Sequence, residues 1–526
     1  MMKRRTQTLL TLWLVLGFGW ASAQSVTLTP SRHGVEGGET RKTLVALELS
    51  DLPNTGDLEI DFTLTGKTPE LVTSLELLIS DVVLERDVND YPPGWIAYTV
   101  IPVAPSANSV SIPIERLGKN RVLYLTADLA TPEEFSILNR LTCTINSVSI
   151  DGKEVEMKQQ GAETSRRFFR LYRPLYVPGD NGSRNYRIPA ILRTSKGTLL
   201  AVADRRKFNQ IDIPEDIDLV VRRSYDNGTT WTDQGEIVVG RGWGAGYGDA
   251  ALVETASGKI VLLCVGGQGL WRGTPEDPMP TYLMTSDDDG ITWSKPRDIT
   301  PFLYGKDCDD PVRSKFYSSF CASGQGLRTS SGRIIFVAAM RTDEQYKLDN
   351  YAIYSDDEGE TWQVSDVACI GGDESKVIQL HSGAILMSIR NPKREERIFK
   401  LSYDDGQTWQ ETDAYAGLHD PAVDGAPLLV QWQGKTTLLH SLPIGPRSRT
   451  DGAVYIYDED RSSWSEPILI NPGMSAYSDM VLIDEETIGY FVEEDDQMSL
   501  VFITFTTDDL AQLQEESRKK QEYTIH

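Results

Sequence analysis

The chain has 526 residues, and 52 Lys and Arg against 77 Asp and Glu give it a formal net charge of −25. This surplus of negative charge repels nucleic-acid backbones and anionic lipid, so both are excluded as partners in the absence of a basic patch, and the sequence contains none. With 40% hydrophobic residues and 11 Trp, the composition is typical of a globular protein and excludes a disordered one.

The first 23 residues have the pattern of a secretory signal peptide. Basic residues at 3–5 precede an apolar run at 9–20, and Ala21-Ser22-Ala23 supplies an A-x-A cleavage site. Cleavage after Ala23 predicts a protein of the periplasm or the extracellular space. No later stretch is apolar over the length that a membrane span needs. We expect a monomer.

Residues 24–165 alternate between apolar and polar side chains, as at 58–64 and 141–145. This period of two is typical of half-buried antiparallel strands. It predicts a β-sandwich domain that ends at the polar stretch 163–170.

Residues 166–505 contain a repeat in which a small turn leads into an apolar strand. Its glycines stand at 197, 258, 332, 383 and 434, and a weaker sixth copy covers 484–488. Repeats of about 40 to 70 residues that hold several strands each are typical of propeller blades. The predicted fold is therefore all-β, with a six-bladed β-propeller after the sandwich.

A second repeat has the fixed pattern S-x-D-x-G-x-T-W, known as the Asp box. Four copies occur, at 224–231, 286–293, 355–362 and 402–409, and a decayed fifth covers 457–464. The pattern predicts a hairpin in which Asp accepts hydrogen bonds from the turn, Gly takes a positive φ and Trp packs beneath. Calcium binding is the alternative, but the spaced acidic ligands and closing Glu of an EF-hand loop are missing.

The remaining features add no metal or redox motif. The five His have no zinc-ligand spacing, and serine-hydrolase and phosphate-loop motifs are missing, so we expect neither a metal nor another cofactor. The five Cys leave two alternatives, a Cys308–Cys321 bridge or buried free thiols. The tail at 506–526 has an acidic start and a basic end, which predicts a short polar helix.

Tyr186-Arg187-Ile188-Pro189 precedes the first Asp box. Together with the four boxes it resembles the secreted bacterial sialidases (neuraminidases), whose signature is [FY]-R-I-P upstream of such boxes. The resemblance covers about residues 170–505. It implies an exo-α-sialidase, a glycoside hydrolase that releases terminal sialic acid from glycoproteins, glycolipids or oligosaccharides.

Sialidases hold the carboxylate of their substrate with three arginines, a residue type whose planar fork pairs bidentately with a carboxylate. The signature gives Arg187 as the first. The family spacing from a Glu to the second arginine matches Glu374 and Arg390. The third is Arg449 by its surrounding pattern, and Arg447 stays open as the alternative.

The family uses a tyrosine as its nucleophile, and Ser475-Ala476-Tyr477-Ser478 resembles its G-Y-S segment with Ala in place of Gly. A neutral phenol is not repelled by the carboxylate on the reacting carbon, whereas a carboxylate nucleophile would be. Because a phenol is protonated at neutral pH, it needs a base. We assign Tyr477 as nucleophile and Glu374 as its base, which implies hydrolysis with retention through a tyrosine-linked intermediate.

The family's general acid is an Asp on the loop before the first Asp box. Asp212 is the preferred candidate, and Asp216 stays open. The resemblance also places Arg206, or its neighbour Arg205, near the substrate carboxylate or hydroxyls. Asp249 matches a position near the N-acyl side of the sugar.

Several alternatives use the same residues. A trans-sialidase would pass the intermediate to a sugar instead of water. A propeller that binds sialoglycans without turnover would be favoured if Tyr477, Glu374 or the loop Asp were missing. The 24–165 sandwich would serve either as a carbohydrate-binding module or as structural support, and its only Trp, Trp95, must then carry any stacking platform.

Overall fold

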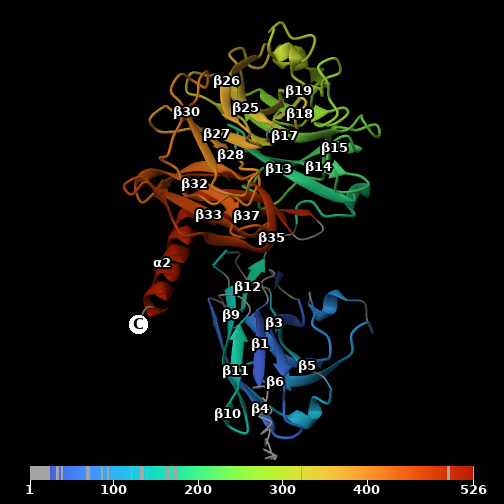
Figure 1. Cartoon of the computed structure of the whole chain (residues 1–526), viewed down its shortest axis with the longest axis vertical. Coiled ribbons are helices and arrows are strands. Elements are labelled where there is room, and N and C mark those ends of the chain that lie inside the picture. The colour runs from blue at the N-terminus through green and yellow to red at the C-terminus, as the bar shows by residue number, and fades with distance from the viewer. Residues whose placement is uncertain are drawn as a thin grey trace, which may run out of the picture. The chain divides into compact units, whose positions relative to one another are not determined.

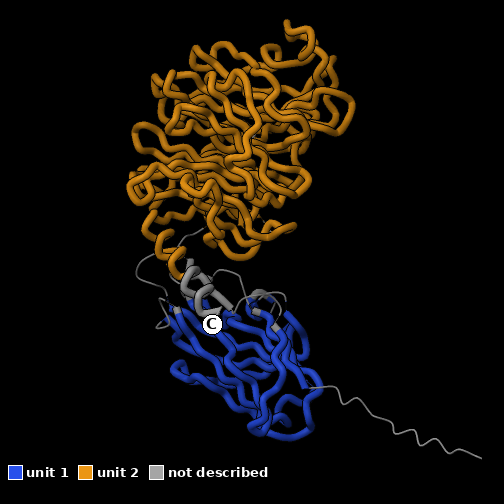
Figure 2. The backbone as a smooth tube through the Cα atoms, turned by 60° about the vertical axis from the view of Figure 1, so that its left-hand side comes forward, with its two compact units in different colours: residues 1–31, 38–130, 141–166 blue, residues 32–37, 131–140, 167–526 orange. Residues whose placement is uncertain are grey.

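The computed structural model describes two compact units (Figures 1 and 2). The described residues are 24–30, 35–36, 39–66, 71–84, 87–91, 94–119, 121–130, 136–138, 140–159, 165–170, 174–321, 323–494 and 498–524. Unit 1 comprises residues 1–31, 38–130 and 141–166, and unit 2 comprises 32–37, 131–140 and 167–526. The expected signal peptide, at 1–23, lies outside the described residues.

Unit 1 is built from two sheets. One has the strand order β11-β1-β3-β8-β5-β6, from β1 (Ser25–Pro30), β3 (Lys42–Ser50), β5 (Val72–Ser80), β6 (Tyr98–Val103), β8 (Val122–Leu129) and β11 (Glu156–Gln159). The other contains β4 (Asp57–Gly66), β7 (Ser109–Pro113), β9 (Arg140–Ile150) and β10 (Lys153–Glu154). Leu58, Ile60 and Phe62 of β4 are buried, as their alternation with polar residues predicts. A short parallel pair joins β2 (Val35–Glu36) and β12 (Ser165–Arg170).

Unit 2 is a succession of antiparallel groups in which each main strand pairs with the next along the chain. The first two groups are β13 (Asn185–Arg193), β14 (Leu199–Arg206), β15 (Ile217–Ser224) and β16 (Gly235–Val238), then β17 (Tyr247–Glu254), β18 (Ile260–Gly266), β19 (Thr281–Ser286) and β20 (Arg297–Asp298). The next two are β21 (Ser318–Cys321), β24 (Ile334–Arg341), β25 (Asp349–Ser355) and β26 (Gln363–Ile370), then β27 (Ser375–Gln379), β28 (Ile385–Ile389), β29 (Ile398–Ser402) and β30 (Gln410–Glu411). The short strands β22 (Gly324–Gln325) and β23 (Leu327–Arg328) pair with β17 and β24.

The last sheet contains two such groups joined by one long strand. It consists of β31 (Pro427–Trp432), β32 (Lys435–Pro443), β33 (Thr450–Asp458), β34 (Ser463–Trp464), β35 (Ile468–Leu482), β36 (Thr487–Glu494) and β37 (Ser499–Thr506). The first part of β35 pairs with β33 and its second part with β36. Leu175 and Tyr176, which precede the first group, bond to Leu500 in β37. The two ends of the strand succession are therefore hydrogen-bonded to each other.

The four Asp boxes have the hairpin structure that their pattern predicts. In the first, Asp226 Oδ1 accepts from the Thr230 amide at 2.8 Å, and Trp231 Nε1 donates to the Gly228 carbonyl at 3.0 Å. Gly228 has a φ of 89°, which an L side chain adopts only with strain. Ser, Asp, Gly and Trp are therefore used for the turn itself, and the structural interpretation of the boxes is confirmed.

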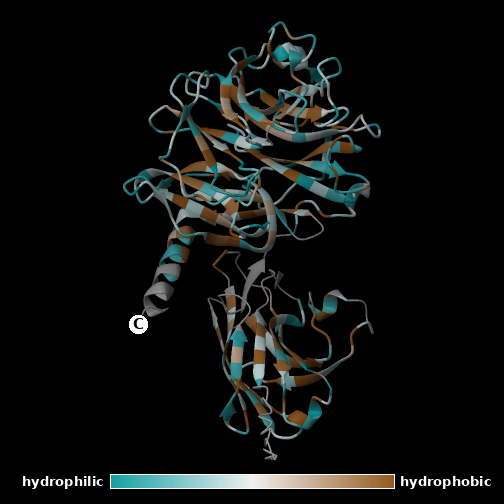
Figure 3. Ribbon diagram, in the orientation of Figure 1, coloured by the Kyte–Doolittle hydropathy of each residue, from teal (hydrophilic) through white to brown (hydrophobic). Residues whose placement is uncertain are grey.

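Helices are few, so the class is all-β as predicted. Among the described residues they are α1 (Thr300–Leu303), α2 (Thr507–Thr524) in the tail, and the 3-10 turns η2 (Val88–Asp90), η3 (Ile114–Arg116), η4 (Asp180–Gly182) and η5 (Arg313–Lys315). Within the described part of the chain, no helix is long and apolar enough to cross a membrane. Figure 3 shows hydrophobic positions concentrated in the strands and hydrophilic ones in the loops.

The cysteines settle one of the open alternatives. All five are buried and free, so the Cys308–Cys321 bridge does not form. Cys321 lies in β21 with its side chain inside an apolar cluster that includes Phe336. A buried thiol of this kind packs as a small apolar group.

Candidate active site

Arg187 lies in β13 directly before a β-bulge. The bulge falls between the paired residues Arg187–Asp204 and Ala190–Val202. Pro189 has no amide hydrogen to donate to a ladder, so it fits a strand only at such an irregularity. Ile188 has a φ of 61°, which is strained for a β-branched residue. Its amide donates to Glu493 Oε1 at 3.0 Å, which holds the bulge in place. The R-I-P sequence thus forms the bulge that directly follows Arg187.

Glu493, in β36, is the fixed partner of Arg187. Its carboxylate accepts from Arg187 Nε at 2.8 Å and Nη2 at 3.2 Å, and also from the Tyr477 amide at 3.2 Å. Burial alone would raise the pKa of Glu493, but the Arg187 charge and these hydrogen bonds hold it below its usual value. The Glu493 carboxylate therefore stays ionised and orients the guanidinium. Glu493 was missed in the sequence, because an acidic residue in a strand carries no motif.

Tyr477 and Glu374 are 103 residues apart in the chain and come from different strand groups of unit 2. Tyr477 Oη donates to Glu374 Oε1 at 2.5 Å, and Arg390 Nη1 donates to Tyr477 Oη at 2.8 Å as well as to Glu374 Oε2. Tyr477 lies in β35 between the bulge partners Ser475 and Ser478, and Glu374 directly precedes β27. The phenol is thus in contact with one carboxylate and one guanidinium.

Three guanidiniums surround the Tyr477 side chain. Arg187 Cζ and Arg449 Cζ each lie 5.0 Å from the centre of its ring, in addition to the Arg390 hydrogen bond. Burial and the Glu374 charge raise the pKa of Tyr477 well above its usual value, while the three arginines act in the opposite direction. The phenol is therefore neutral, and its proton points to a carboxylate.

Arg449 and Arg447 are placed differently. Arg449 Nη2 donates to the Ala422 carbonyl at 3.1 Å and its guanidinium lies over the Tyr477 ring. Arg447 is exposed, and its carbonyl accepts from Arg394 Nη1 at 3.1 Å. Only Arg449 therefore joins the cluster around the phenol.

Asp212 lies on the loop between β14 and β15, and its side chain is 68% exposed. Its Oδ1 pairs with Arg206 Nη2 at 2.7 Å, and the same nitrogen contacts Asp204 Oδ2 at 3.0 Å. Partial enclosure would raise the pKa of Asp212, but the charges of Arg206 and Arg187 lower it. Asp216 instead pairs with Lys207 at 2.8 Å and is mostly buried. Asp212 is therefore the accessible carboxylate of this loop.

Of the other residues predicted from the sequence, Asp249 and Arg206 contact Asp204, whereas Arg205 has other partners. Asp249 has a φ of 57° at a bulge in β17, and its amide donates to Asp204 Oδ1 at 3.1 Å. Burial raises the pKa of Asp204 to about 6, and burial together with the Asp204 charge raises that of Asp249 well above its usual value. Arg205, in contrast, pairs with Asp218 at 2.6 Å and with Glu236 at 2.7 Å, away from Arg206.

A buried charged cluster ties together the strands that carry these residues. Lys376 Nζ pairs with Asp424, which also accepts from Ser323 Oγ at 3.1 Å. Asp479, two residues after Tyr477, accepts from the Ile191 amide of β13 at 3.0 Å. A side chain at Gly324 would clash with Lys376 Cε, and its Cβ would lie 3.1 Å from Asp479 Oδ2. Lys376 and both carboxylates therefore converge beside Gly324.

This cluster was not identified in the sequence. Lys376 stands two residues after Glu374, and a lysine in a strand of mixed character is usually a solvated charge. Its side chain is only 3% exposed. The one signal was the position of two acidic residues, Asp424 and Asp479, close to the ends of otherwise apolar strands, and this signal is weak.

Residues 197–491 match the family model described as a BNR repeat-like domain. A sialidase of Bacteroides fragilis is 27% identical over 414 residues, which cover 73% of this chain and 72% of that protein. A sialidase of Micromonospora viridifaciens is 31% identical over 348 residues, covering 61% of this chain and 51% of that protein. Among solved structures, a Hadza microbial sialidase aligns with a TM-score of 0.71 and 21% identity over 91% of this chain and 99% of that one.

Proposed function

The chain belongs to the family of BNR repeat-like domains, and on this basis we propose that it is an exo-α-sialidase, a glycoside hydrolase that releases terminal sialic acid from glycoproteins, glycolipids or oligosaccharides. The observation that carries the proposal is the contact of a tyrosine with one carboxylate inside a set of three guanidiniums. Two curated sialidases among its relatives support it.

The proposal extends to the finer points of the fold. We propose that the antiparallel groups of unit 2 are six propeller blades, counting the two that share β35, and that unit 1 is a β-sandwich. In unit 1, Trp95 is 76% exposed, so it is available as a stacking surface for carbohydrate. We also propose that residues 1–23 are a secretory signal peptide, that the protein is periplasmic or secreted, and that it is a monomer.

Arg187, Arg390 and Arg449 would bind the carboxylate of the sialic acid. Each already has a fixed partner, respectively Glu493, Glu374 and the Ala422 carbonyl. These partners hold the guanidiniums in place before substrate arrives, which reduces the entropy lost on binding. A sugar without a carboxylate would give these three guanidiniums no anion to bind beyond their fixed partners, so this set favours acidic sugars.

The Tyr477 oxygen would attack the anomeric carbon while its proton passes to Glu374. The bond from that carbon to the glycosidic oxygen breaks, and Asp212 protonates the departing oxygen. Water then attacks the tyrosine-linked intermediate, assisted by the Asp212 carboxylate, and Tyr477 recovers its proton from Glu374. Two displacements at one carbon retain its configuration.

Binding of the negatively charged substrate would also change the pKa of Asp212, the proposed general acid. The positive charges of Arg206 and Arg187 lower the pKa of Asp212. When a substrate carboxylate pairs with Arg187 and Arg449, part of that positive field is neutralised. Binding would therefore raise the pKa of Asp212 toward the value that a general acid needs at neutral pH.

The experiment that tests the proposal is hydrolysis of a fluorogenic aryl α-sialoside by the full chain, with proton NMR to identify the anomer that forms first. Release of the α-anomer first would support hydrolysis with retention. Transfer to an added sugar in place of hydrolysis would indicate a trans-sialidase. Sialoside binding without turnover would contradict the hydrolase and indicate a sialoglycan-binding propeller.

Arg449 and Arg447 form a matched pair for substrate binding. Arg449→Met is expected to raise KM about 10- to 100-fold, because a hydrogen bond to a charged group contributes about 1.5–3 kcal/mol. Arg447→Met should leave KM within about twofold, since this side chain is exposed and outside the cluster. Steady-state kinetics on the aryl sialoside measure both. An equal rise for the two variants would contradict the assignment of Arg449.

Asp212 and Asp216 are distinguished by the leaving group. Asp212→Asn is expected to lower kcat/KM about 10²-fold for a sialyl oligosaccharide and much less for an aryl sialoside, because a phenolate departs without a proton. Asp216→Asn removes a carboxylate that pairs with Lys207, so both substrates should be affected alike. A leaving-group dependence in Asp216→Asn and none in Asp212→Asn would reverse the assignment.

A further inference from the structure

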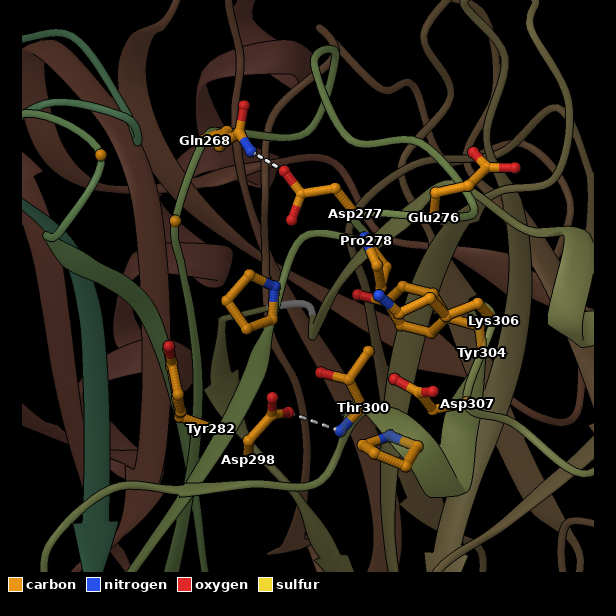
Figure 4. Close-up of a pocket in the computed structure, with 14 residues that line it drawn as sticks. Gln268, Glu276, Asp277, Pro278, Tyr282, Asp298, Thr300, Tyr304, Lys306 and Asp307 are labelled. Carbon is orange, nitrogen blue, oxygen red and sulfur yellow. Dashed lines mark hydrogen bonds between the residues drawn. The ribbon is translucent and has the colours of Figure 1, made fainter.

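A pocket of about 410 Å³ opens in unit 2 beside α1 (Figure 4). Its walls come from the loop after β16, the loop between β18 and β19, the loop after α1, α1 itself and residues of β19 and β20. Its volume lies within the ~300–1,000 Å³ range of small-molecule sites. None of the residues around the Tyr477 phenol lines it.

The pocket presents flat apolar faces. Pro278, Pro280 and Pro301 line it together with the rings of Tyr282 and Tyr304. Tyr304 is buried, with its hydroxyl donating to the Met279 carbonyl, whereas Tyr282 is only partly buried and leaves its ring accessible to a ligand. Rings of this kind pack against the C–H face of a sugar while leaving its hydroxyls to polar neighbours.

Hydrogen-bond acceptors surround these faces. Asp298, Asp307, Glu276 and Asp277 all line the pocket, and Lys306 is its only cationic lining residue. Figure 4 shows Asp277, held by Gln268, above Asp298, which accepts from the Thr300 amide at 2.9 Å. Within the described residues no group of three or more His, Cys, Asp or Glu is placed to hold a metal ion.

The charged groups that line the pocket indicate which class of ligand it would bind. Sugar hydroxyls donate hydrogen bonds, and carboxylate oxygens accept them strongly. Four carboxylates against one ammonium repel a second anion, so an acidic sugar is disfavoured. The pocket therefore fits a neutral sugar ring.

The pocket adjoins the loop of the candidate acid. Gly244 lines the pocket, and its amide donates to the Pro214 carbonyl at 2.7 Å, two residues after Asp212. A Cβ at Gly269, in the loop between β18 and β19, would lie 2.6 Å from the Ile213 carbonyl oxygen. Two of the loops that line the pocket therefore contact the Asp212 loop, which carries the candidate acid for the leaving group.

One exposed ring stands next to a residue that lines the pocket. Trp243, directly before Gly244, is 59% exposed, and Arg272 Cζ lies 5.0 Å from the centre of its ring. An exposed indole can stack on a sugar ring, so Trp243 would extend the binding surface next to the pocket.

We propose that this pocket binds a neutral sugar of the glycan that carries the sialic acid, one or more rings beyond the bond that is cleaved. The inference rests on the proposed sialidase function for its placement on the leaving-group side. It makes the chain selective for extended sialoglycans over short sialosides.

The test compares a sialylated tetrasaccharide with an aryl α-sialoside that lacks the additional sugars. Asp307→Lys places a long cation in the pocket, and Asp309→Lys makes the same charge change on an exposed residue of the same loop that does not line it. Asp307→Lys is expected to lower kcat/KM for the tetrasaccharide at least about fivefold, mainly through KM, with the aryl sialoside unchanged within twofold. Asp309→Lys should change neither. Equal effects on both substrates, or none on the tetrasaccharide, would overturn the proposal.

A direct measurement separates this proposal from the function of the catalytic site. Saturation-transfer NMR of the neutral trisaccharide that remains after sialic acid is removed should show binding to the wild type and to Asp309→Lys, and loss of binding in Asp307→Lys. If the protein hydrolyses the aryl sialoside but does not bind the trisaccharide, the pocket proposal fails alone. If it binds the trisaccharide but hydrolyses no sialoside, the sialidase proposal fails and the sugar pocket stands.

Discussion

Tyr477→Phe is expected to lower kcat for an aryl α-sialoside by at least about 10³-fold, because loss of a nucleophile removes a covalent path that no neighbouring group replaces. The substitution deletes only the hydroxyl that donates to Glu374 and accepts from Arg390. The ring that Arg187 and Arg449 approach remains, so substrate binding should be retained. Steady-state kinetics and sialoside binding by calorimetry measure the two effects separately.

Tyr455→Phe is the matched control for this change. Tyr455 is buried in the same apolar cluster as Tyr477, so loss of its hydroxyl reports on packing alone. We expect Tyr455→Phe to keep most of the wild-type rate. Rapid-quench mass spectrometry should detect a sialyl adduct on the wild type and none on Tyr477→Phe. If Tyr477→Phe kept more than a tenth of the wild-type kcat, the nucleophile would have to be another group.

Lys376→Met is expected to destabilise unit 2 by about 3–5 kcal/mol, the usual cost of removing one partner from a buried ion pair. Lys376 and Asp424 are 3% and 2% exposed, and water cannot replace the lost ammonium. Asp479 lies beside the same cluster and is buried as well. Urea unfolding followed by tryptophan fluorescence measures the change.

The loss should depend on pH in a defined direction. Burial raises the pKa of Asp479 to about 7 and raises that of Asp424, while Lys376 acts in the opposite direction for both. Without Lys376 the native state would hold protons on these carboxylates that the unfolded state has released above about pH 4. Stability of Lys376→Met should therefore fall as the pH rises from about 5 to 8.

A second substitution tests the cause. Lys376→Met combined with Asp424→Asn removes both charges. The double variant should therefore regain part of the lost stability, and its stability should depend much less on pH than that of Lys376→Met. If the double variant were less stable than Lys376→Met by the full effect of a second independent substitution, the two side chains would not act as a pair.

Sequence patterns predicted the parts of the molecule that depend on local spacing. The Asp boxes determine their own hairpins within eight residues, and the alternation at 58–64 follows directly from the pleat of one strand. The resemblance to sialidases brought Arg187, Arg390, Arg449, Glu374 and Tyr477 into one list, and the structure brings the same five side chains into one cluster.

The partners of these residues could not be predicted, because each is distant in sequence and common in type. Glu493 lies 306 residues after Arg187, and neither its strand nor its neighbours have a motif. From the sequence, Lys376 is expected to be a surface charge. Only the packing of its strand among the sheets shows that the side chain is buried. The choice of Asp212 over Asp216 depends on which side chain of one loop Lys207 binds, and spacing contains no information on that contact.

The hydrogen bonds between Tyr176 and Leu500 have a consequence for how the molecule is made. The strand succession closes only when β37 pairs with a segment synthesised some hundreds of residues earlier, so the early groups must wait with one edge unpaired. Arg187 likewise has no ion-pair partner until Glu493, 306 residues later, has been synthesised. A chain interrupted between β35 and β36 would thus contain nearly all of the binding and reacting side chains and yet lack a working site. Activity should appear abruptly with the last two strands rather than grow with chain length.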